Sequence, residues 1–419
     1  MKSIWSEENR FRKMTFLSID YLLYLTKDEN RDAIQVLVNN IDRKKFVEEF
    51  QEEEKVTRHE TVAFLNTLSK YISPYEHYLH YGLTSSDLLD TVFSMQLKCA
   101  LLEIESQLSR LFNELKTKAL EYKDVLIVGR THGMYAECTT VGLKFLSWAM
   151  EIGRSLDRVY SAMRHCSVGK LSGPVGNYTV CNPEIEKIVL EAQNLFPEVV
   201  STQIIPRDRY AEVFTTLAIL ASSIERIATE IRNHSRSDIG EFHEGKSAGS
   251  SSMPHKENPV GSENLCGLAR IIRGYVIPAL ENVVLWHERD MSHSSAERII
   301  AQDATSLVYY MVTRLREIIE NLVINNERVE ENIKRANGVE YSHALLCLLV
   351  RKNLNKENAQ KILSNIAEHS RKSGINFINL CKVNDDLLRI ITVEEIDQIL
   401  LQDIFRKNVN IIFKRAGVN

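Results

Sequence analysis

Apolar residues recur at helical intervals through most of this chain. Residues 83–128 contain neither Gly nor Pro, and their apolar side chains follow one another at steps of three, four or six. Ser86 or Asp87 can cap this helix, whose apolar stripe consists of Leu88, Val92, Met95, Cys99, Leu102, Leu108, Leu111 and Leu115. The same pattern predicts helices over about 141–166 and 208–237, the second with the stripe Val213, Leu217, Leu220, Ile224, Ile227 and Ile231.

A further stretch without Gly or Pro covers residues 279–337, and we expect it to break near 289–295. Residues 217–221 are all apolar, so their helix is expected to be buried from several directions within a bundle. The best strand candidate, residues 125–128, is short. The pattern therefore predicts an all-α fold.

Three helical domains are expected along the chain. Shorter segments, in which charged and apolar residues alternate, occupy residues 1–85 and 338–419. The long helices fall within residues 86–337, which we predict to form a central bundle domain.

Residues 240–261, GEFHEGKSAGSSSMPHKENPVG, interrupt the central helices with Gly, Ser and Pro. Four of the 17 Gly and two of the 8 Pro lie here, which favours a mobile loop because Gly widens backbone freedom. Composition alone is more typical of a solvated linker, since most loops of this kind carry no chemistry. His255, Lys256 and Asn258, which directly follow the serines, favour a site of chemistry instead.

Composition and charge exclude several classes of protein. With 419 residues, of which 44% are hydrophobic and 26% charged, the chain has the values of a globular protein with a large core. A net charge of −4 gives no general attraction for nucleic acid or anionic lipid. No apolar run approaches the roughly 18 residues of a membrane span, and residues 1–14 lack a secretory apolar core, so we expect a cytoplasmic protein.

The 7 cysteines are scattered and include no Cys-x-x-Cys pair. We therefore expect reduced packing thiols, with neither a disulfide framework nor a zinc site. The sequence has no cluster of metal ligands and no Gly-rich phosphate loop before a helix, so neither a metal nor an organic cofactor is expected.

Four other polar segments break the helices, at residues 58–60, 80–87, 129–133 and 286–298. Each is expected to be a helix end or a loop. Helix N-termini expose unpaired backbone N–H groups, so they suit carboxylates and phosphates. Taken singly, each segment also has a structural explanation, since a TSSD run is typical of a helix cap and His59, His80 or His132 of a surface or core histidine.

Together these segments match a known pattern. Residues 249–259, GSSSMPHKENP, resemble the signature loop of the fumarase/aspartase superfamily, G-S-S-x-M-P-x-K-x-N-P. Residues 80–87, 129–132 and 286–298, the last with its HSSAER run, are similar to the corresponding segments of the adenylosuccinate lyase family in that superfamily. The resemblance covers essentially the whole chain and implies a central long-helix bundle. It also implies a homotetramer in which each pocket is built from three subunits.

The resemblance implies a lyase of purine biosynthesis that eliminates fumarate from an N-succinyl nucleotide, namely adenylosuccinate and also the related succinylated imidazole carboxamide nucleotide. A proton leaves the carbon beside a carboxylate, and an acid protonates the departing nitrogen. By resemblance His132 is the general acid, with a substrate ligand as its alternative role, and Ser250 is the general base. Because a serine hydroxyl is a weak base, we expect Lys256 to stabilise its alkoxide or the substrate carboxylate. Glu263 is expected to orient His132 or Lys256.

The resemblance also implies contacts to this small-molecule substrate. Thr84 and Ser85 match residues that hold a substrate carboxylate, and Gln203 matches a substrate-binding amide. Two arginines with a hydroxyl suit the phosphate and ribose, although Arg298 alone is also typical of a surface salt bridge. The full set expected to bind substrate is Arg58, His59, Glu60, His80, Thr84, Ser85, Thr131, Gln203, Ser251, Met253, Asn258, Arg289, Ser294 and Arg298.

Three departures from the family pattern concern the nucleotide side. The usual Arg-Tyr pair is not found before the stretch that resembles the family at Ser3, Ile4 and Trp5. Glu60 stands where the family has Asp, and Glu257 where it commonly has Arg. A paralogous lyase for a different N-succinyl compound is therefore the alternative hypothesis. A catalytically silent scaffold is a third, which the presence of the acid, the base and the loop lysine disfavours.

Overall fold

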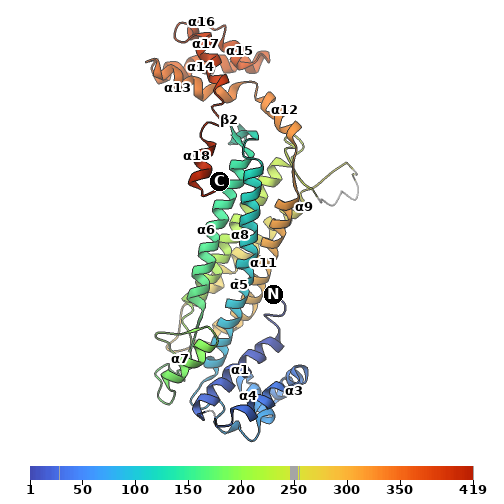
Figure 1. Cartoon of the computed structure of the whole chain (residues 1–419), viewed down its shortest axis with the longest axis vertical. Coiled ribbons are helices and arrows are strands. Elements are labelled where there is room, and N and C mark those ends of the chain that lie inside the picture. Colours follow the sequence, from blue (N-terminus) through green and yellow to red (C-terminus); the bar gives the residue numbers. More distant parts are fainter. Residues whose placement is uncertain (28, 246–252, 254, 419) are drawn as a thin grey trace. The chain divides into compact units, whose positions relative to one another are not determined.

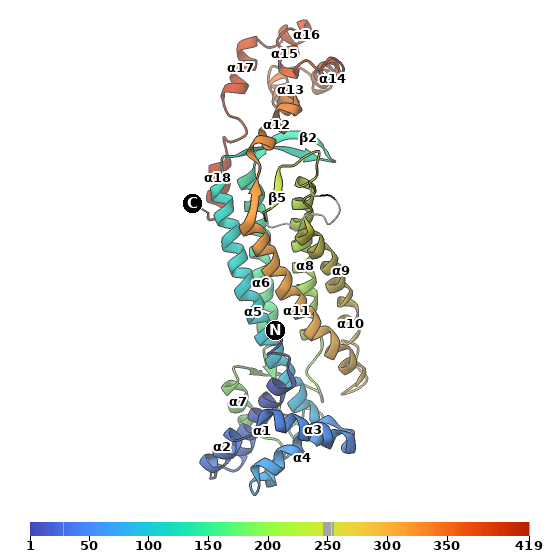
Figure 2. The ribbon, with the colours of Figure 1, turned by 90° about the vertical axis from the view of Figure 1, so that its right-hand side faces the viewer.

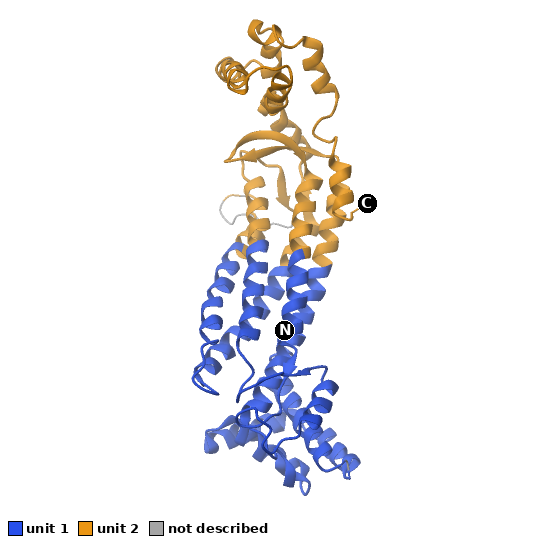
Figure 3. Ribbon diagram, turned by 90° about the vertical axis from the view of Figure 1, so that its left-hand side faces the viewer, with its two compact units in different colours: residues 1–109, 154–224, 266–313 blue, residues 110–153, 225–265, 314–419 orange. Residues whose placement is uncertain are grey.

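The computed structural model describes the chain apart from residues 28, 246–252, 254 and 419. The chain divides into two compact units (Figure 3): residues 1–109, 154–224 and 266–313 form unit 1, and residues 110–153, 225–265 and 314–419 form unit 2. Long helices contribute residues to both units, namely α5 (Ser85–Glu121), α6 (Val141–Cys166), α8 (Asp208–His234), α9 (Val260–Gly274) and α11 (Ser292–Asn321). The prediction of three domains stays a prediction.

Unit 1 begins with a helical cluster at the N-terminal end of the chain. Its helices are α1 (Glu7–Leu25), α2 (Arg31–Asn39), α3 (Arg43–Thr57), α4 (Glu60–Ile72) and the 3₁₀ helix η1 (Glu76–Tyr78). Aromatic side chains of α1, α3 and α4 form its core, where Phe11, Phe46 and Phe64 are buried against one another. The other elements of unit 1 are β3 (Val168–Gly169), α7 (Pro183–Ala192), β4 (Phe196–Pro197) and α10 (Val276–Glu281).

Unit 2 contains two short antiparallel pairs of strands and the C-terminal helices. β1 (Leu126–Thr131) pairs with β2 (Met134–Thr140), and β5 (Phe242–Glu244) pairs with β6 (Leu322–Ile324). A separate core of Leu345, Leu349, Phe377 and Leu387 stabilises the C-terminal helices. The remaining elements are α12 (Asn326–Ala336), η2 (Val339–Tyr341), α13 (Ser342–Arg351), α14 (Lys356–Ser373), α15 (Phe377–Cys381), α16 (Asp385–Leu388), α17 (Val393–Leu401) and α18 (Val409–Arg415).

The long helices confirm the prediction of a mainly helical fold. Figures 1 and 2 show α5, α6, α8 and α11 side by side. The bounds of α6 coincide with the predicted range, and the stripe predicted on α8, from Val213 to Ile231, is completely buried. The predicted cap of α5 was wrong, because the helix begins at Ser85 and so places Ser86 and Asp87 inside its first turn.

Two other details of the helices differ from prediction. Leu102 was expected in the buried stripe of α5 but is exposed, because a helix turns by about 100° per residue and the inward positions belong to Leu101 and Ile104. Residues 279–337 were expected to break only once. They break before α11 and again at β6, because the apolar residues 322–324 pair with β5 instead of extending the helix.

The segment 129–133 is a strand and a tight turn, so the expectation of a helix end or loop was wrong. Its strand β1 extends the predicted 125–128 candidate and pairs with β2, ending at Thr131 opposite Met134. His132 and Gly133 connect the strands with φ angles of 54° and 77°. Two central residues with positive φ give a turn whose twist suits a two-residue hairpin, although His-Gly is not one of the pairs that typically predict such a turn.

All 7 cysteines are free thiols, and five of them are buried, as expected for packing residues. Among the described residues, no helix has the length and apolar character needed to cross a membrane.

Candidate active site

The junction between α3 and α4 carries the first predicted segment of the site. Arg58 ends α3 with a φ of 51°, and Nδ1 of His59 caps α4 by accepting a backbone N–H at 3.4 Å. The side chains of Arg58 and His59 are exposed. Glu60 is largely buried, and its carboxylate forms ion pairs with both Arg10 and Arg298. The predicted helix end is confirmed here, and it places one carboxylate between two arginines.

The chain enters α5 through Thr84 and Ser85, and a buried ion pair fixes this entry. The carboxylate of Asp87 accepts hydrogen bonds from the backbone N–H groups of Thr84 (2.7 Å) and Ser172 (3.1 Å), and it pairs with Nζ of Lys170. The side chains of Asp87 and Lys170 are completely buried. The pair therefore holds the backbone that presents the two residues predicted to bind a carboxylate.

We expect Lys170→Met to lower the free energy of unfolding by about 3–5 kcal/mol, because it leaves the Asp87 charge buried without its partner. Urea denaturation of both proteins measures this loss. Lys70→Met is the matched control, since Lys70 forms an exposed pair with Glu53 and such pairs contribute about 0–1 kcal/mol. A loss from Lys170→Met as small as that of the control would contradict the role of the buried pair.

His80 and Gly82 shape the turn before this entry. Both have positive φ angles, 63° and 77°, and the carbonyl of Gly82 accepts a hydrogen bond from the thiol of Cys181 at 3.0 Å. Nδ1 of His80 is buried and has no hydrogen-bond partner among the described residues. Burial lowers the pKa of His80 to about 4, so the imidazole is neutral near pH 7.

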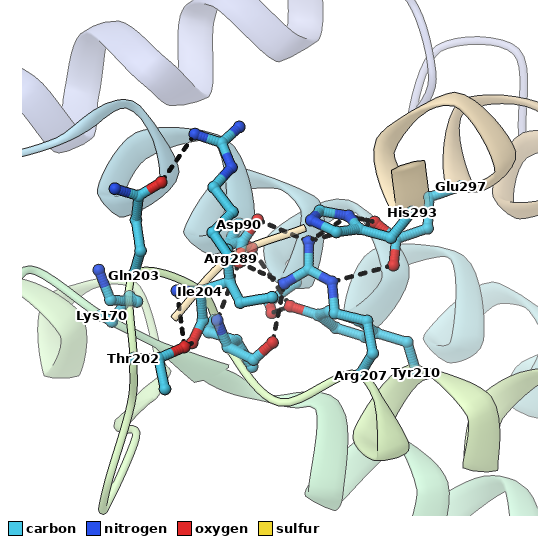
Figure 4. A network of polar contacts seen from close by, with 12 residues as sticks. Asp90, Lys170, Thr202, Gln203, Ile204, Arg207, Tyr210, Arg289, His293 and Glu297 are labelled. Atoms are coloured by element: carbon cyan, nitrogen blue, oxygen red, sulfur yellow. Dashed lines mark hydrogen bonds and ion pairs between the residues drawn. The ribbon is translucent and has the colours of Figure 1, made fainter. Parts of the chain in front are cut away.

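Arg207 is the centre of a buried polar network in unit 1 (Figure 4). Its guanidinium contacts Asp90 through Nη1 (2.5 Å) and Nη2 (2.9 Å) and contacts Glu297 through Nε (3.1 Å). Nδ1 of His293 lies 3.0 Å from Nη2. Although burial works against the charged form of Asp90, the guanidinium keeps its pKa below the ordinary value. The network places one buried guanidinium between two carboxylates, next to the predicted nucleotide residue Arg289.

Gln203 and Arg289 meet beside this network. Nη1 of Arg289 donates to Oε1 of Gln203 at 2.9 Å, and the backbone N–H of Gln203 donates to the carbonyl of Glu288 at 3.2 Å (Figure 4). These contacts connect two predicted substrate residues that are 86 positions apart. The predicted amide is thereby oriented by the predicted arginine.

A cavity of about 270 Å³ in unit 1 brings together Glu60, Arg289, Ser294 and Arg298, four of the predicted substrate residues. The side chains of Arg58, His59, His80, Thr84, Ser85 and Gln203 are not among its lining residues. Residues that sequence reasoning did not assign complete the lining, including Arg10, Asp90, Arg207, His293 and Glu297. The HSSAER run contained two of them, whereas no local signal marked Arg10 or Asp90.

In unit 2 the hairpin of β1 and β2 presents His132 at its tip, where the side chain is exposed together with that of Thr131. Arg130 anchors the hairpin through a two-point contact with Glu241, with both distances 3.0 Å. Glu241 is completely buried and lies 2.7 Å from Nδ1 of His234. A fully paired carboxylate therefore fixes the strand that ends at the predicted general acid.

The predicted signature loop lies between β5 and α9. Ser250 and Ser251 lie outside the described residues. Met253, Lys256 and Glu263 are exposed, and Asn258 is half-buried just before α9. The expectation that Glu263 orients His132 or Lys256 stays a prediction.

Glu244 joins the two sides of this loop. Its carboxylate accepts the backbone N–H groups of Gly261 (3.0 Å) and Ser262 (2.8 Å) at the start of α9. Because the first N–H groups of a helix have no partners within the helix, this contact stabilises the N-terminus of α9. The residues 240–261 thus begin with a strand and end in a capped helix, so the expectation of a loop throughout was wrong at both ends.

Comparisons with solved structures identify the class of fold. The chain superimposes on fumarate lyase from Mesorhizobium sp. BNC1 with a TM-score of 0.88 and 18% identity, covering 100% of this chain and 97% of that chain. The cycloisomerase for beta-carboxy-cis,cis-muconate from Acinetobacter calcoaceticus sp. ADP1 gives a TM-score of 0.84 and 18% identity, covering 99% and 96%. A family model described as lyase matches residues 19–274. The fold and the site segments define an enzyme of the lyase class.

Relatives identify the family within that class. The adenylosuccinate lyase of Aquifex aeolicus is 39% identical, with 99% of this chain and 97% of the relative covered. The adenylosuccinate lyase of Bacillus subtilis is 39% identical, with 100% and 98% covered. The chain belongs to the adenylosuccinate lyase family of the fumarase/aspartase superfamily. Among the described residues, no group of three or more His, Cys, Asp and Glu is arranged to hold a metal ion.

Proposed function

We propose that the chain eliminates fumarate from adenylosuccinate to give AMP, and from the related succinylated imidazole carboxamide nucleotide in the same way. The observation that carries this proposal is the cavity that gathers Arg289, Ser294 and Arg298, the three residues assigned to ribose and phosphate, in a chain of this family. Guanidinium groups with a hydroxyl bind a phosphomonoester through charge-assisted hydrogen bonds. The small-molecule substrate is thus a nucleotide.

In the proposed mechanism a base removes a proton from the succinyl carbon beside a carboxylate. The electron pair forms the double bond of fumarate, and the carbon–nitrogen bond breaks. We assign the base to Ser250, assisted by Lys256, and the acid that protonates the departing nitrogen to His132. Thr84 and Ser85, presented by a fixed backbone, bind the succinyl carboxylates, and Gln203, held by Arg289, positions the substrate.

We propose a homotetramer with pockets shared between subunits. Apolar side chains exposed on the long helices of unit 1 are available for contacts with other copies of the chain; they are Leu102, Ile219, Ile271, Ile299 and Tyr310. The exposed position of His132 agrees with a site that another copy completes. Light scattering tests the proposal, with an expected mass of four times the 48.1 kDa chain. The free thiols also support a cytoplasmic location.

A comparison of substrates tests the proposed function. Adenylosuccinate, the succinylated imidazole carboxamide nucleotide and argininosuccinate are incubated with the protein, and fumarate is measured by chromatography. We expect fumarate from both nucleotides and none from argininosuccinate, which has no phosphate for the arginines. Fumarate from argininosuccinate alone would instead favour the paralogous lyase.

A further inference from the structure

Arg10 of α1 reaches the same cavity as the predicted phosphate residues. Its side chain is 29% exposed, and it pairs with Oε1 of Glu60 while Nη2 of Arg298 pairs with Oε2 at 2.8 Å. One carboxylate therefore serves two guanidinium groups, which leaves a net charge of about +1 on this trio. Burial and the neighbouring Arg298 lower the pKa of Arg10 to about 10, as expected for two cations that are held close together.

His293 gives an independent indication of a ligand in this cavity. Nδ1 of His293 lies 3.0 Å from Nη2 of Arg207 and 3.2 Å from Oε2 of Glu297. Nε2 of the same ring is buried and has no partner among the described residues. His293 is only 5% exposed and lines the cavity. Buried polar atoms are almost always hydrogen-bonded, and a ligand that enters the cavity supplies a partner for Nε2.

The position of the cavity on α11 favours the same kind of ligand. His293 and Ser294 lie in the first turn of this 30-residue helix. The N-terminus of a helix carries a partial positive charge and exposes backbone N–H groups. The charge of the helix end adds to that of Arg10, Arg289 and Arg298 on the lining.

We propose that Arg10 is a phosphate-binding residue, which forms a clamp with Arg298, and that Glu60 is the internal counter-ion that the substrate phosphate replaces. The identity of the phosphate as that of the nucleotide rests on the proposed function. Glu60 pairs with the guanidinium groups of both Arg10 and Arg298. A phosphomonoester, with about two negative charges and three acceptor oxygens, satisfies both arginines and brings polar atoms into the cavity that His293 lines. Glu60, which is longer than the family's Asp, thus acts as the counter-ion of both arginines.

Calorimetric titration with AMP, adenosine and inorganic phosphate tests this clamp. Arg10→Gln is expected to weaken the binding of AMP and of inorganic phosphate by about tenfold or more, because a charge-assisted contact is lost. The affinity for adenosine is expected to change little. Glu60→Gln is expected to tighten the binding of both AMP and inorganic phosphate, because it removes the competing anion. A merely structural role of either residue would weaken all three ligands alike. Arg12→Gln is the matched control, because Arg12 is exposed on the same helix, donates to Oδ1 of Asn9 and does not line this cavity.

Two outcomes would overturn the clamp. One is an unchanged affinity of Arg10→Gln for inorganic phosphate, and the other is a weaker affinity of Glu60→Gln for AMP. Thermal melting shows whether each variant is folded. Arg10→Lys keeps the charge but loses the planar guanidinium, so its affinity for phosphate is expected to lie between those of wild type and Arg10→Gln. If wild type binds inorganic phosphate but not AMP, the proposed nucleotide substrate is wrong, while the phosphate titration still decides the role of Arg10.

Discussion

His132→Asn is expected to lower kcat by about 10²–10⁴-fold, because general acid catalysis contributes a factor of this size. KM for adenylosuccinate is expected to change little, since the proton is needed only when the nitrogen departs. Asn is chosen because His132 has a φ of 54° and is followed by Gly133 at 77°, and an Asn-Gly pair is the preferred sequence of such a turn. The hairpin should therefore remain intact.

Steady-state kinetics and circular dichroism of His132→Asn measure activity and folding together. His369→Asn is the control, because His369 is exposed on α14 and has no role in the proposed site. A kcat within about threefold of wild type, together with a raised KM, would assign His132 to substrate binding rather than to acid catalysis.

Ser250→Ala is expected to lower kcat by a similar factor of about 10²–10⁴, because it removes the proposed base. Affinity for the product AMP is expected to be retained, because the proposed phosphate residues lie elsewhere in the chain. Arg10 is on α1, Arg289 lies just before α11, and Ser294 and Arg298 are on α11. Rapid-quench measurement of fumarate and calorimetric titration of AMP separate the two effects. Ser252→Ala is the matched control in the same run of serines. Activity of Ser250→Ala equal to that of Ser252→Ala would remove the base assignment.

The long helices could be predicted from the sequence because their information is local. Apolar residues at helical steps specify α6 and α8 without reference to the rest of the chain. The hairpin could not be predicted as easily, because β2, MYAECTT, has little apolar alternation and a pair of strands depends on both partners. Helix content was therefore more predictable than the turn that presents His132.

The residues of the candidate site could be predicted where they lie in one contiguous motif. They could not be predicted where the contact joins residues far apart in the sequence. The HSSAER run identified Ser294 and Arg298 from their neighbours alone. The pair of Asp87 and Lys170 joins residues 83 positions apart, and the contact of Arg298 with Glu60 spans 238 positions. Such pairs depend on tertiary packing, so no local pattern in one sequence reveals them.

Two residues that depart from the family pattern, Glu60 and Glu257, differ in whether the structure explains them. Glu60 has a physical explanation, because it neutralises two arginines that line the cavity. Glu257 is exposed beside Lys256, and nothing in the described residues explains why it replaces an arginine.

The central claim is that this chain splits an N-succinyl nucleotide into fumarate and a nucleotide. Proton magnetic resonance of adenylosuccinate incubated with the wild-type protein tests it directly. We predict that the succinyl signals disappear while fumarate and AMP appear in equal amounts, and that the His132→Asn protein slows both changes together. Unchanged adenylosuccinate in the presence of the folded wild-type protein would contradict the account.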